Sequence, residues 1–175
     1  MITKCATTPS ATVLRALSGM QPTSKFGELF QYSNLMAAAA GYIGGHVLYP
    51  DMELGAAYDL AMQKQVFDPL GMKITTFDYD RALLGNHATP HGLDVDGHTA
   101  VAGMGINDSI RAARPAGAAW SAVSDMLRYV QMELADGVLP DGQRYVSKAA
   151  LVRTMWRRCS IASSTRWPSD VNRRA

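Results

Sequence analysis

The stretch FGELFQYSNLMAAAAGYIGG, Phe26 to Gly45, carries the most informative pattern in this sequence of 175 residues. From Leu35 onward it is apolar on every side of a helix, which predicts a helix buried on most sides. Tyr32, Ser33 and Asn34 stand directly before this run. Ser33 or Asn34 suits the N-cap, because a short polar side chain can accept a hydrogen bond from a free N–H of the first turn. The same three residues could also carry chemistry.

The composition is that of a chain that can form a core. Apolar residues make up 47% of the sequence and charged residues 18%, so wholesale disorder is not expected. No uninterrupted apolar run of about eighteen residues occurs, which predicts no transmembrane helix. Residues 1–20 lack an apolar region behind a basic start, so we expect no signal peptide and a cytoplasmic chain as written. Cys5 and Cys159 are expected to be free thiols.

The net charge of +2 is unevenly distributed. From Arg153 onward the sequence holds six arginines, no lysine and one acidic residue, whereas the preceding part has a small excess of acids. An arginine-rich end can contact phosphate. Because this end lacks an RNA-binding motif, we expect a basic, unstructured tail over residues 157–175 and no nucleic-acid binding.

Helical patterns alternate with one long irregular segment. Residues 11–20 predict a short helix, and a second helix is predicted from an N-cap at Asp51 to a stop at Gly71. Residues 73–118 are rich in Gly, Pro, Asp, Asn and His. They indicate a long loop with a small hairpin around Asp96-Gly97.

Two further helices are predicted toward the C-terminal end. The first has Ser121 as N-cap and ends at Gly137. Its apolar side chains recur at helical spacing and form one stripe, which consists of Val123, Met126, Leu127, Val130 and Leu134. The second covers residues 147–156, with Ser147 as its N-cap.

Several motifs occur in an order that resembles a known family. FQYSN precedes the small-residue helix, and it is followed by VFDPLGM, TTF, NHATPHG, PAGAAWSAVSDM and DGQRYVS. Over residues 20–156 this order resembles the serine β-lactamase-related family, which includes class C β-lactamases, family VIII carboxylesterases, D,D-peptidases and D-aminopeptidases. The resemblance implies an acyl-serine mechanism on a β-lactam, an ester or a D-amino acid peptide, with no cofactor.

The resemblance also assigns roles to residues before the helix. In this family a serine of a Ser-x-x-Lys motif attacks a carbonyl group, and the tyrosine of a Tyr-x-Asn motif shares the proton traffic. Tyr32 would take this catalytic role, and its phenol would need nearby cations to act as a base. Asn34 would bind the amide group of the substrate. Ser33 is better suited to capping or packing than to nucleophilic attack.

The motifs that would supply the nucleophile are missing from this sequence. A serine hydroxyl needs an adjacent base to become a good nucleophile. No serine precedes a lysine by three residues at any of the five lysines, which are Lys4, Lys25, Lys64, Lys73 and Lys148. No Lys-Thr-Gly occurs either. We therefore expect an internal fragment of a longer enzyme that is inactive as this chain, or alternatively a non-catalytic helical binding or complementation module.

A metal site is not expected. His87 and His91 have the spacing of helical metal ligands, but Pro90 lies between them and makes a helix improbable.

The fold expected from the resemblance is mainly α with short strands. Residues 1–156 would form a partial domain that corresponds to the helical part of the α/β fold of β-lactamases and penicillin-binding proteins, with most of the sheet missing. Helix faces that normally contact the sheet would then be exposed, and this favours self-association. The expected partner is otherwise a small acyl substrate of the full-length form, and no membrane contact is expected.

Overall fold

The computed structural model describes residues 10–152. The chain divides into two compact units, Met1–Asp125 and Met126–Ala175. The predicted basic tail, residues 157–175, lies outside the described residues, as do both cysteines. Among the described residues, no helix is long and apolar enough to cross a membrane.

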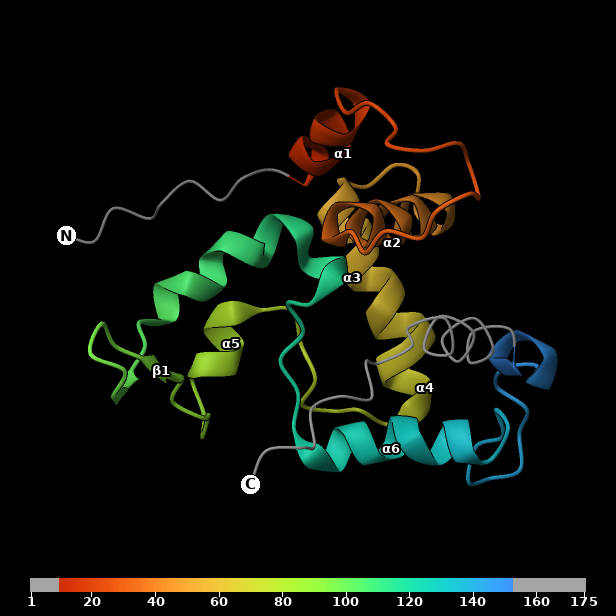
Figure 1. The fold of residues 1–175 in the computed structure, drawn as a ribbon. Coiled ribbons are helices and arrows are strands. Elements are labelled where there is room, and N and C mark those ends of the chain that lie inside the picture. Colours follow the sequence, from red (N-terminus) through yellow and green to blue (C-terminus); the bar gives the residue numbers. More distant parts are fainter. Residues whose placement is uncertain (1–9, 153–175) are drawn as a thin grey trace, which may run out of the picture. The chain divides into compact units, whose positions relative to one another are not determined.

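The first unit begins with two helices that the sequence predicts. Helix α1 spans Ala11–Ser18 and is followed by Gly19, and α2 spans Asn34–Leu48 (Figure 1). Ser33 is the N-cap of α2, because its hydroxyl accepts a hydrogen bond from the Met36 N–H at 3.3 Å. The predicted capping role of this trio therefore belongs to Ser33, and Asn34 is the first residue of the helix.

The next helical segment is continuous but changes its winding. Helix α3 (Leu54–Met62) passes into a π-helical turn, η1 (Gln63–Phe67), and then into α4 (Asp68–Leu70). Gly71 ends it with a φ of 68°, as predicted, because glycine adopts this left-handed conformation without steric cost. The predicted N-cap Asp51 is wrong. Glu53 caps the helix instead, since its longer carboxylate reaches the Ala56 N–H at 3.0 Å.

The segment predicted as a long loop contains the expected hairpin and also two helices. Strands β1 (His91–Leu93) and β2 (Thr99–Val101) pair antiparallel, with Gly92 opposite Ala100. Helix α5 spans Tyr79–Leu83, and η2 spans Met104–Ala116, in which 3₁₀ turns are merged across a kink. The prediction did not include either helix, because their residues show only a weak helical pattern. Contacts with the rest of the unit can stabilise helical structure in spite of a weak local pattern.

The core of the first unit lies where α2 meets α3 and η2. Its buried centre consists of Val13, Ala38, Tyr42 and Tyr58. The Tyr42 and Tyr58 rings meet edge-on at 6.0 Å, and the Tyr42 hydroxyl donates a hydrogen bond of 2.5 Å to the Ala112 carbonyl of η2. Through these two contacts, the Tyr42 side chain links α2 to both α3 and η2.

A buried carboxylate secures the segment after α4. Asp125 is 4% exposed, and its Oδ2 accepts hydrogen bonds of 2.9 Å from the backbone N–H groups of Ile74 and Thr75 and from the Thr75 hydroxyl. The Thr75 and Ser121 hydroxyls share a bond of 2.8 Å. Ser121 is thus bonded to Thr75, and the structure assigns it no capping bond to the helix that follows.

Helix α6 (Val123–Leu134) begins in the first unit and continues into the second. As predicted, its C-terminal turn closes at Gly137, which has a φ of 84°. In the second unit the Lys148 ammonium donates to the Asp136 carboxylate at 2.6 Å. The Ser147 hydroxyl accepts from the Ala150 N–H at 3.2 Å. Residues 148–152 are helical, and the rest of the helix predicted to 156 lies outside the described residues.

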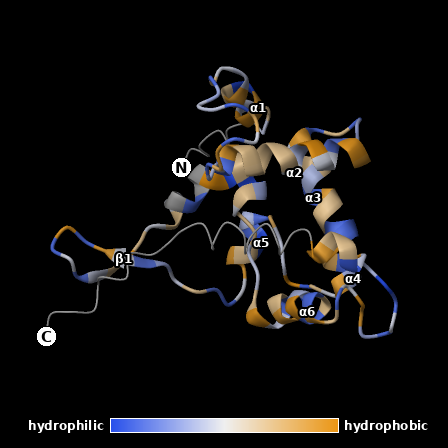
Figure 2. Ribbon diagram, turned by 45° about the vertical axis from the view of Figure 1, so that its right-hand side comes forward, coloured by the Kyte–Doolittle hydropathy of each residue, from blue (hydrophilic) through white to orange (hydrophobic). Residues whose placement is uncertain are grey.

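The described residues are mainly helical, and their only sheet has two strands. This confirms the predicted fold class. The prediction that α2 is buried on most sides is wrong. Figure 2 shows α2 in hydrophobic colours over most of its length, yet several of its large side chains are exposed: Met36, Ile43, Val47 and Leu48. The helix is apolar all round, but within residues 10–152 its neighbours cover only one side of it.

The apolar stripe of α6 is also exposed. Val123 and Leu134, near its two ends, are 77% and 82% exposed. The other three members of the stripe, Met126, Leu127 and Val130, are exposed as well. A stripe of this kind normally packs against a neighbouring element, so the sequence pattern is present and its partner surface is not among the described residues.

Candidate functional site

The two residues that the sequence predicts for chemistry lie together at the entrance of α2. Tyr32 is the last residue but one before the helix, and Asn34 is its first residue. Ser33 between them holds this geometry, because its hydroxyl is committed to the N-cap bond with Met36. The cap bond fixes the backbone from which Tyr32 and Asn34 project.

Both side chains are accessible. Tyr32 is 80% exposed, and Asn34 is exposed too. Among residues 10–152, neither the Tyr32 phenol nor the Asn34 amide makes a hydrogen bond or an ion pair. The segment around them is apolar and likewise exposed, with Phe26, Leu29, Phe30 and Met36. Tyr32 and Asn34 are thus two accessible polar side chains at the start of α2, with no hydrogen-bond partner within residues 10–152.

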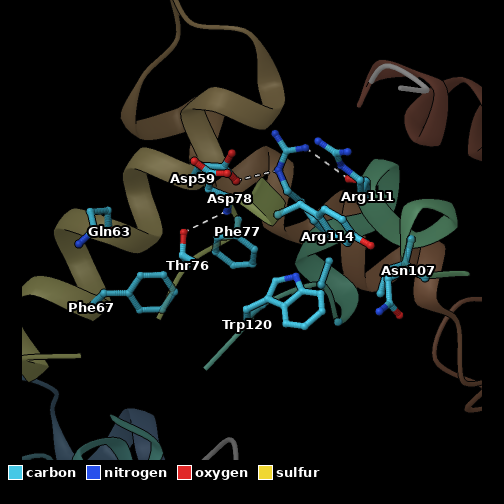
Figure 3. A pocket seen from close by; sticks show the side chains of 15 residues that line it. Asp59, Gln63, Phe67, Thr76, Phe77, Asp78, Asn107, Arg111, Arg114 and Trp120 are labelled. Atoms are coloured by element: carbon cyan, nitrogen blue, oxygen red, sulfur yellow. Dashed lines mark hydrogen bonds and ion pairs between the residues drawn. The ribbon is translucent and has the colours of Figure 1, made fainter. Parts of the chain in front are cut away.

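A cavity of about 600 Å³ lies elsewhere in the first unit, and neither Tyr32 nor Asn34 lines it. Its walls come from α3 and η1, from residues 76–79, from η2 and from residues 117–120 (Figure 3). Thr76 and Trp120 exchange backbone hydrogen bonds of 2.9 and 2.8 Å, so two of these walls are joined directly. The pattern of the sequence did not reveal this site, because its walls are separate segments that only the fold brings together.

An ion pair forms the polar edge of the cavity. Arg114 Nε donates to Asp59 Oδ1 at 2.7 Å, and Arg114 Nη1 donates to the Arg111 carbonyl at 3.3 Å. Burial raises the pKa of the Asp59 carboxyl, and the Arg114 guanidinium opposes this by lowering it. Gly55 makes room for the pair, because a Cβ there would collide with the Arg114 guanidinium. The Arg114 guanidinium is therefore positioned by its ion pair with Asp59, and the absence of a side chain at Gly55 leaves the space that it occupies.

Aromatic rings form the apolar part of the cavity. Phe67 and Phe77 lie 5.7 Å apart between centroids, and Trp120 meets Tyr79 edge-on at 5.6 Å. The guanidinium of Arg111 lies 5.5 Å from the centroid of the Tyr79 ring, within the range of a cation–π contact. The cavity therefore combines several aromatic rings, inclined to one another, with a charged edge.

Two other tyrosines are structural. Burial raises the pKa of Tyr58 to about 12 and raises the pKa of Tyr42 as well. Both phenols are therefore protonated at neutral pH and cannot accept a proton from a substrate. Compared with these two buried side chains, Tyr32 is 80% exposed, so a substrate can reach its hydroxyl.

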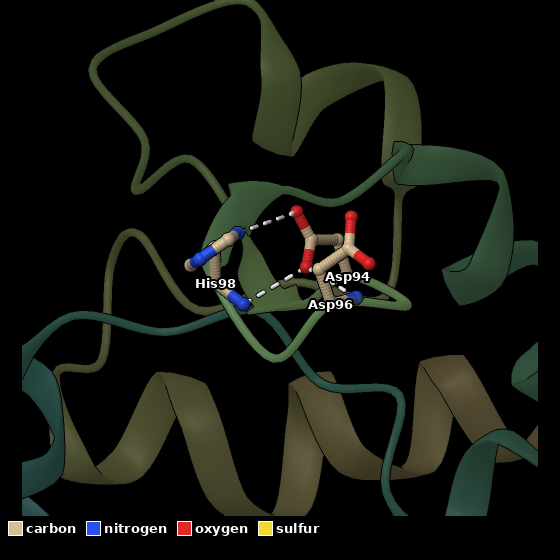
Figure 4. Close-up of side chains that lie close together, drawn as sticks. All are labelled: Asp94, Asp96 and His98. Carbon is tan, nitrogen blue, oxygen red and sulfur yellow. Dashed lines mark hydrogen bonds and ion pairs between the residues drawn. The ribbon is translucent and has the colours of Figure 1, made fainter.

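Three side chains at the tip of the hairpin have the chemistry of metal ligands. Asp94, Asp96 and His98 lie close together and are exposed (Figure 4). Asp94 Oδ1 accepts the backbone N–H groups of Asp96 at 3.0 Å and His98 at 2.8 Å, while Oδ2 lies 3.8 Å from His98 Nδ1. These bonds account for the cluster as an Asx-type turn that closes the hairpin.

Comparison with known proteins places these features in context. A family model described as Beta-lactamase matches residues 3–164, which is most of the chain. A comparison with curated proteins gave no match.

Proposed function

This chain belongs to the beta-lactamase family, and we propose that Tyr32 and Asn34 are its contribution to acyl-transfer chemistry on a β-lactam, an ester or a D-amino acid peptide. The family relationship is to serine hydrolases. The observation that carries the proposal is the Tyr-x-Asn spacing at the entrance of α2, with both functional groups accessible.

The chemistry assigns a separate role to each residue. The Tyr32 phenol relays a proton between a serine hydroxyl and the leaving group. Because a phenol has an ordinary pKa of about 10, this relay needs cations close to its oxygen. The Asn34 amide can donate to a substrate carbonyl and accept from a substrate N–H. The Ser33 cap supports both roles, since it fixes the start of the helix.

The nucleophile must come from outside these residues. The sequence contains no Ser-x-x-Lys, and Ser33 is occupied as a cap. A serine without an adjacent base is a weak nucleophile. We therefore propose that the chain alone does not form an acyl-enzyme, and that acyl transfer requires a serine and a lysine supplied in addition to these 175 residues.

Incubation with a fluorescent penicillin tests the proposal. After denaturation, gel fluorescence and intact mass would report any covalent adduct. We expect none, whereas a serine β-lactamase with an intact Ser-x-x-Lys motif, treated in parallel, should be labelled. A stable adduct of one acyl mass on any serine of this chain would contradict the proposal, and peptide mapping would identify that serine.

A second candidate function is a non-catalytic helical binding or complementation module. The exposed apolar stripe of α6 favours it, as do the exposed side chains around Tyr32. Contiguous exposed apolar surface of this kind marks sites of protein association. In this reading Tyr32 and Asn34 are part of a contact surface, and the chain associates with itself or with another polypeptide through its helix faces.

A further inference from the structure

We propose that the cavity bounded by α3, η1 and η2 is a binding site for a small, uncharged aromatic molecule that carries an amide or a similar polar group. The proposal goes beyond the acyl-transfer role, because neither Tyr32 nor Asn34 lines this cavity. It rests on the size of the cavity, its aromatic wall, its unpartnered polar groups and its charge balance.

The size suits a small molecule. A volume of about 600 Å³ lies within the range of pockets that bind cofactors and drug-sized ligands. All of its walls belong to the first unit, and the paired backbones of Thr76 and Trp120 hold two of them together. The site is therefore formed by the fold of one unit.

The aromatic wall selects a flat ring. In the view of Figure 3, the rings of Phe77 and Trp120 lie below the Asp59–Arg114 pair, with the Phe67 ring to one side. Aromatic rings favour offset-stacked or edge-to-face contact with a further ring, and this adds to the energy of area burial. A planar ligand ring among these side chains gains both contributions.

Two polar groups on the wall have no partner. Among the described residues, the Trp120 indole N–H and the Asn107 side-chain amide make no hydrogen bond. The indole can only donate, and the amide can both donate and accept. A ligand amide satisfies both, because its carbonyl accepts and its N–H donates.

The charges of the lining favour a neutral ligand. Two carboxylates, Asp59 and Asp78, and two guanidinium groups, Arg111 and Arg114, line the cavity. Asp59 and Arg114 neutralise one another at 2.7 Å. A charged ligand would lose its hydration on binding. The lining would not compensate for this loss, because its positive and negative groups are equal in number.

Benzamide is a small probe that contains both an aromatic ring and an amide. Ligand-detected NMR on the full chain would measure its binding. We expect a dissociation constant in roughly the millimolar range, as befits so few atoms. Cyclohexanecarboxamide, which keeps the amide without the aromatic ring, should bind about tenfold more weakly if ring contacts contribute as proposed. Equal binding of the two amides would overturn the aromatic assignment.

Two variants locate the site. Gly117→Leu fills the cavity from its wall, where a Cβ meets nothing within 4 Å and the φ of 164° is extended. It should lose benzamide binding by at least about tenfold. Gly92→Leu in β1 is the matched control, since its Cβ also meets nothing within 4 Å and it does not line the cavity. Thermal melting confirms that both variants are folded.

Trp120→Phe separates the hydrogen bond from the ring contact. It should weaken benzamide binding more than toluene binding, because it removes the indole N–H, which only benzamide can use, and reduces the ring surface for both ligands. Backbone NMR provides a readout that does not depend on any variant, since benzamide should shift the amide signals of Ala118 and Ala119, which line the cavity. No binding by wild type, undiminished binding by Gly117→Leu, or shifts confined to other residues would each overturn the proposal.

Discussion

Arg114 connects two parts of the first unit through one ion pair. Its guanidinium meets Asp59 of α3 at 2.7 Å while its own backbone belongs to η2. The Arg114 side chain is 20% exposed and that of Asp59 40%. A pair in this setting is worth more than a surface pair, but solvent still screens it.

We predict that Arg114→Gln lowers the free energy of unfolding by roughly 1–2 kcal/mol at neutral pH, because it leaves the Asp59 charge without its partner. Burial raises the pKa of Asp59, and loss of the arginine raises it further. A carboxyl with a raised pKa in the folded state favours folding when protonated, and this contribution is lost as the pH rises through the folded pKa. The loss caused by Arg114→Gln should therefore shrink as the pH falls below that value.

Urea unfolding at about pH 7 and about pH 4 checks this prediction. Lys64→Gln is the matched control, because it removes a pair with Asp68 in which both side chains are largely exposed. It should change the unfolding midpoint little at either pH. A destabilisation by Arg114→Gln that is the same at both pH values would show that packing, and not the charge of Asp59, causes it.

The capping role in the trio Tyr32-Ser33-Asn34 follows from local chemistry. A short hydroxyl side chain before a run of good helix formers predicts an N-cap, and Ser33 confirms it. The chemical roles of Tyr32 and Asn34 stay predictions. The cavity around Arg114 and Trp120 had no local signal, because no spacing along the chain relates Asp59 to residues more than fifty positions away.

The packing of α2 requires glycine on one side of the helix and not on another. Gly45 lies against the backbone of Tyr58 in α3, where a Cβ would come within 2.7 Å of its N and Cα atoms. Gly41 lies against the side chain of Pro115 in η2. Gly44, in the same helix, meets nothing within 4 Å. Glycine is therefore needed on the side of α2 that packs against its neighbours, and it is not needed for packing at Gly44.

We predict opposite effects of the same substitution at neighbouring positions. Gly44→Ala should stabilise the protein by about 0.5–1 kcal/mol, because alanine loses less backbone entropy in a helix. Gly45→Ala should destabilise it by about 1–3 kcal/mol, because the methyl group forces the α3 backbone to move. Thermal and urea unfolding of the two variants measure the difference. Stabilisation by Gly45→Ala would mean that α2 and α3 are not in contact at this point.

The elements that the sequence pattern predicted are those with strong local signals. The hairpin follows from Asp96-Gly97, and the end of α4 follows from Gly71. Helices α5 and η2 were missed. The sequence of η2 is interrupted by Gly105 and Pro115, and its 3₁₀ turns pack against α2. Packing of this kind can decide the local structure against propensity.

The exposed helix faces give the chain a surface that favours association. The α6 stripe and the outer side of α2 are apolar and exposed. We predict that the chain self-associates, because covering these side chains removes apolar area from water. Sedimentation velocity over a range of concentrations should show the sedimentation coefficient rising with concentration.

The double variant Val130→Lys with Leu134→Lys should reduce this association, because it places charge on the α6 stripe. Val95→Lys is the control, since Val95 is fully exposed in the loop between β1 and β2 and belongs to neither helix. A sedimentation coefficient that is independent of concentration in wild type would contradict the prediction. Equal effects of the control and the double variant would mean that net charge alone matters.

The amino-acid sequence already determined the family, the mainly helical class and several helix ends, such as those at Ser33, Gly71 and Gly137, because order of motifs, apolar periodicity and capping residues can be read along the chain. The tertiary structure decided which helix faces are covered. The run after Asn34 is apolar all round, and only contact with α3 and η2 selects its buried side. It also decided the cavity, since the Asp59–Arg114 pair and the Trp120 ring meet only after the chain has folded. The trio that opens α2 thus indicates the family only together with the motifs that follow it along the chain, whereas a binding surface exists only in three dimensions.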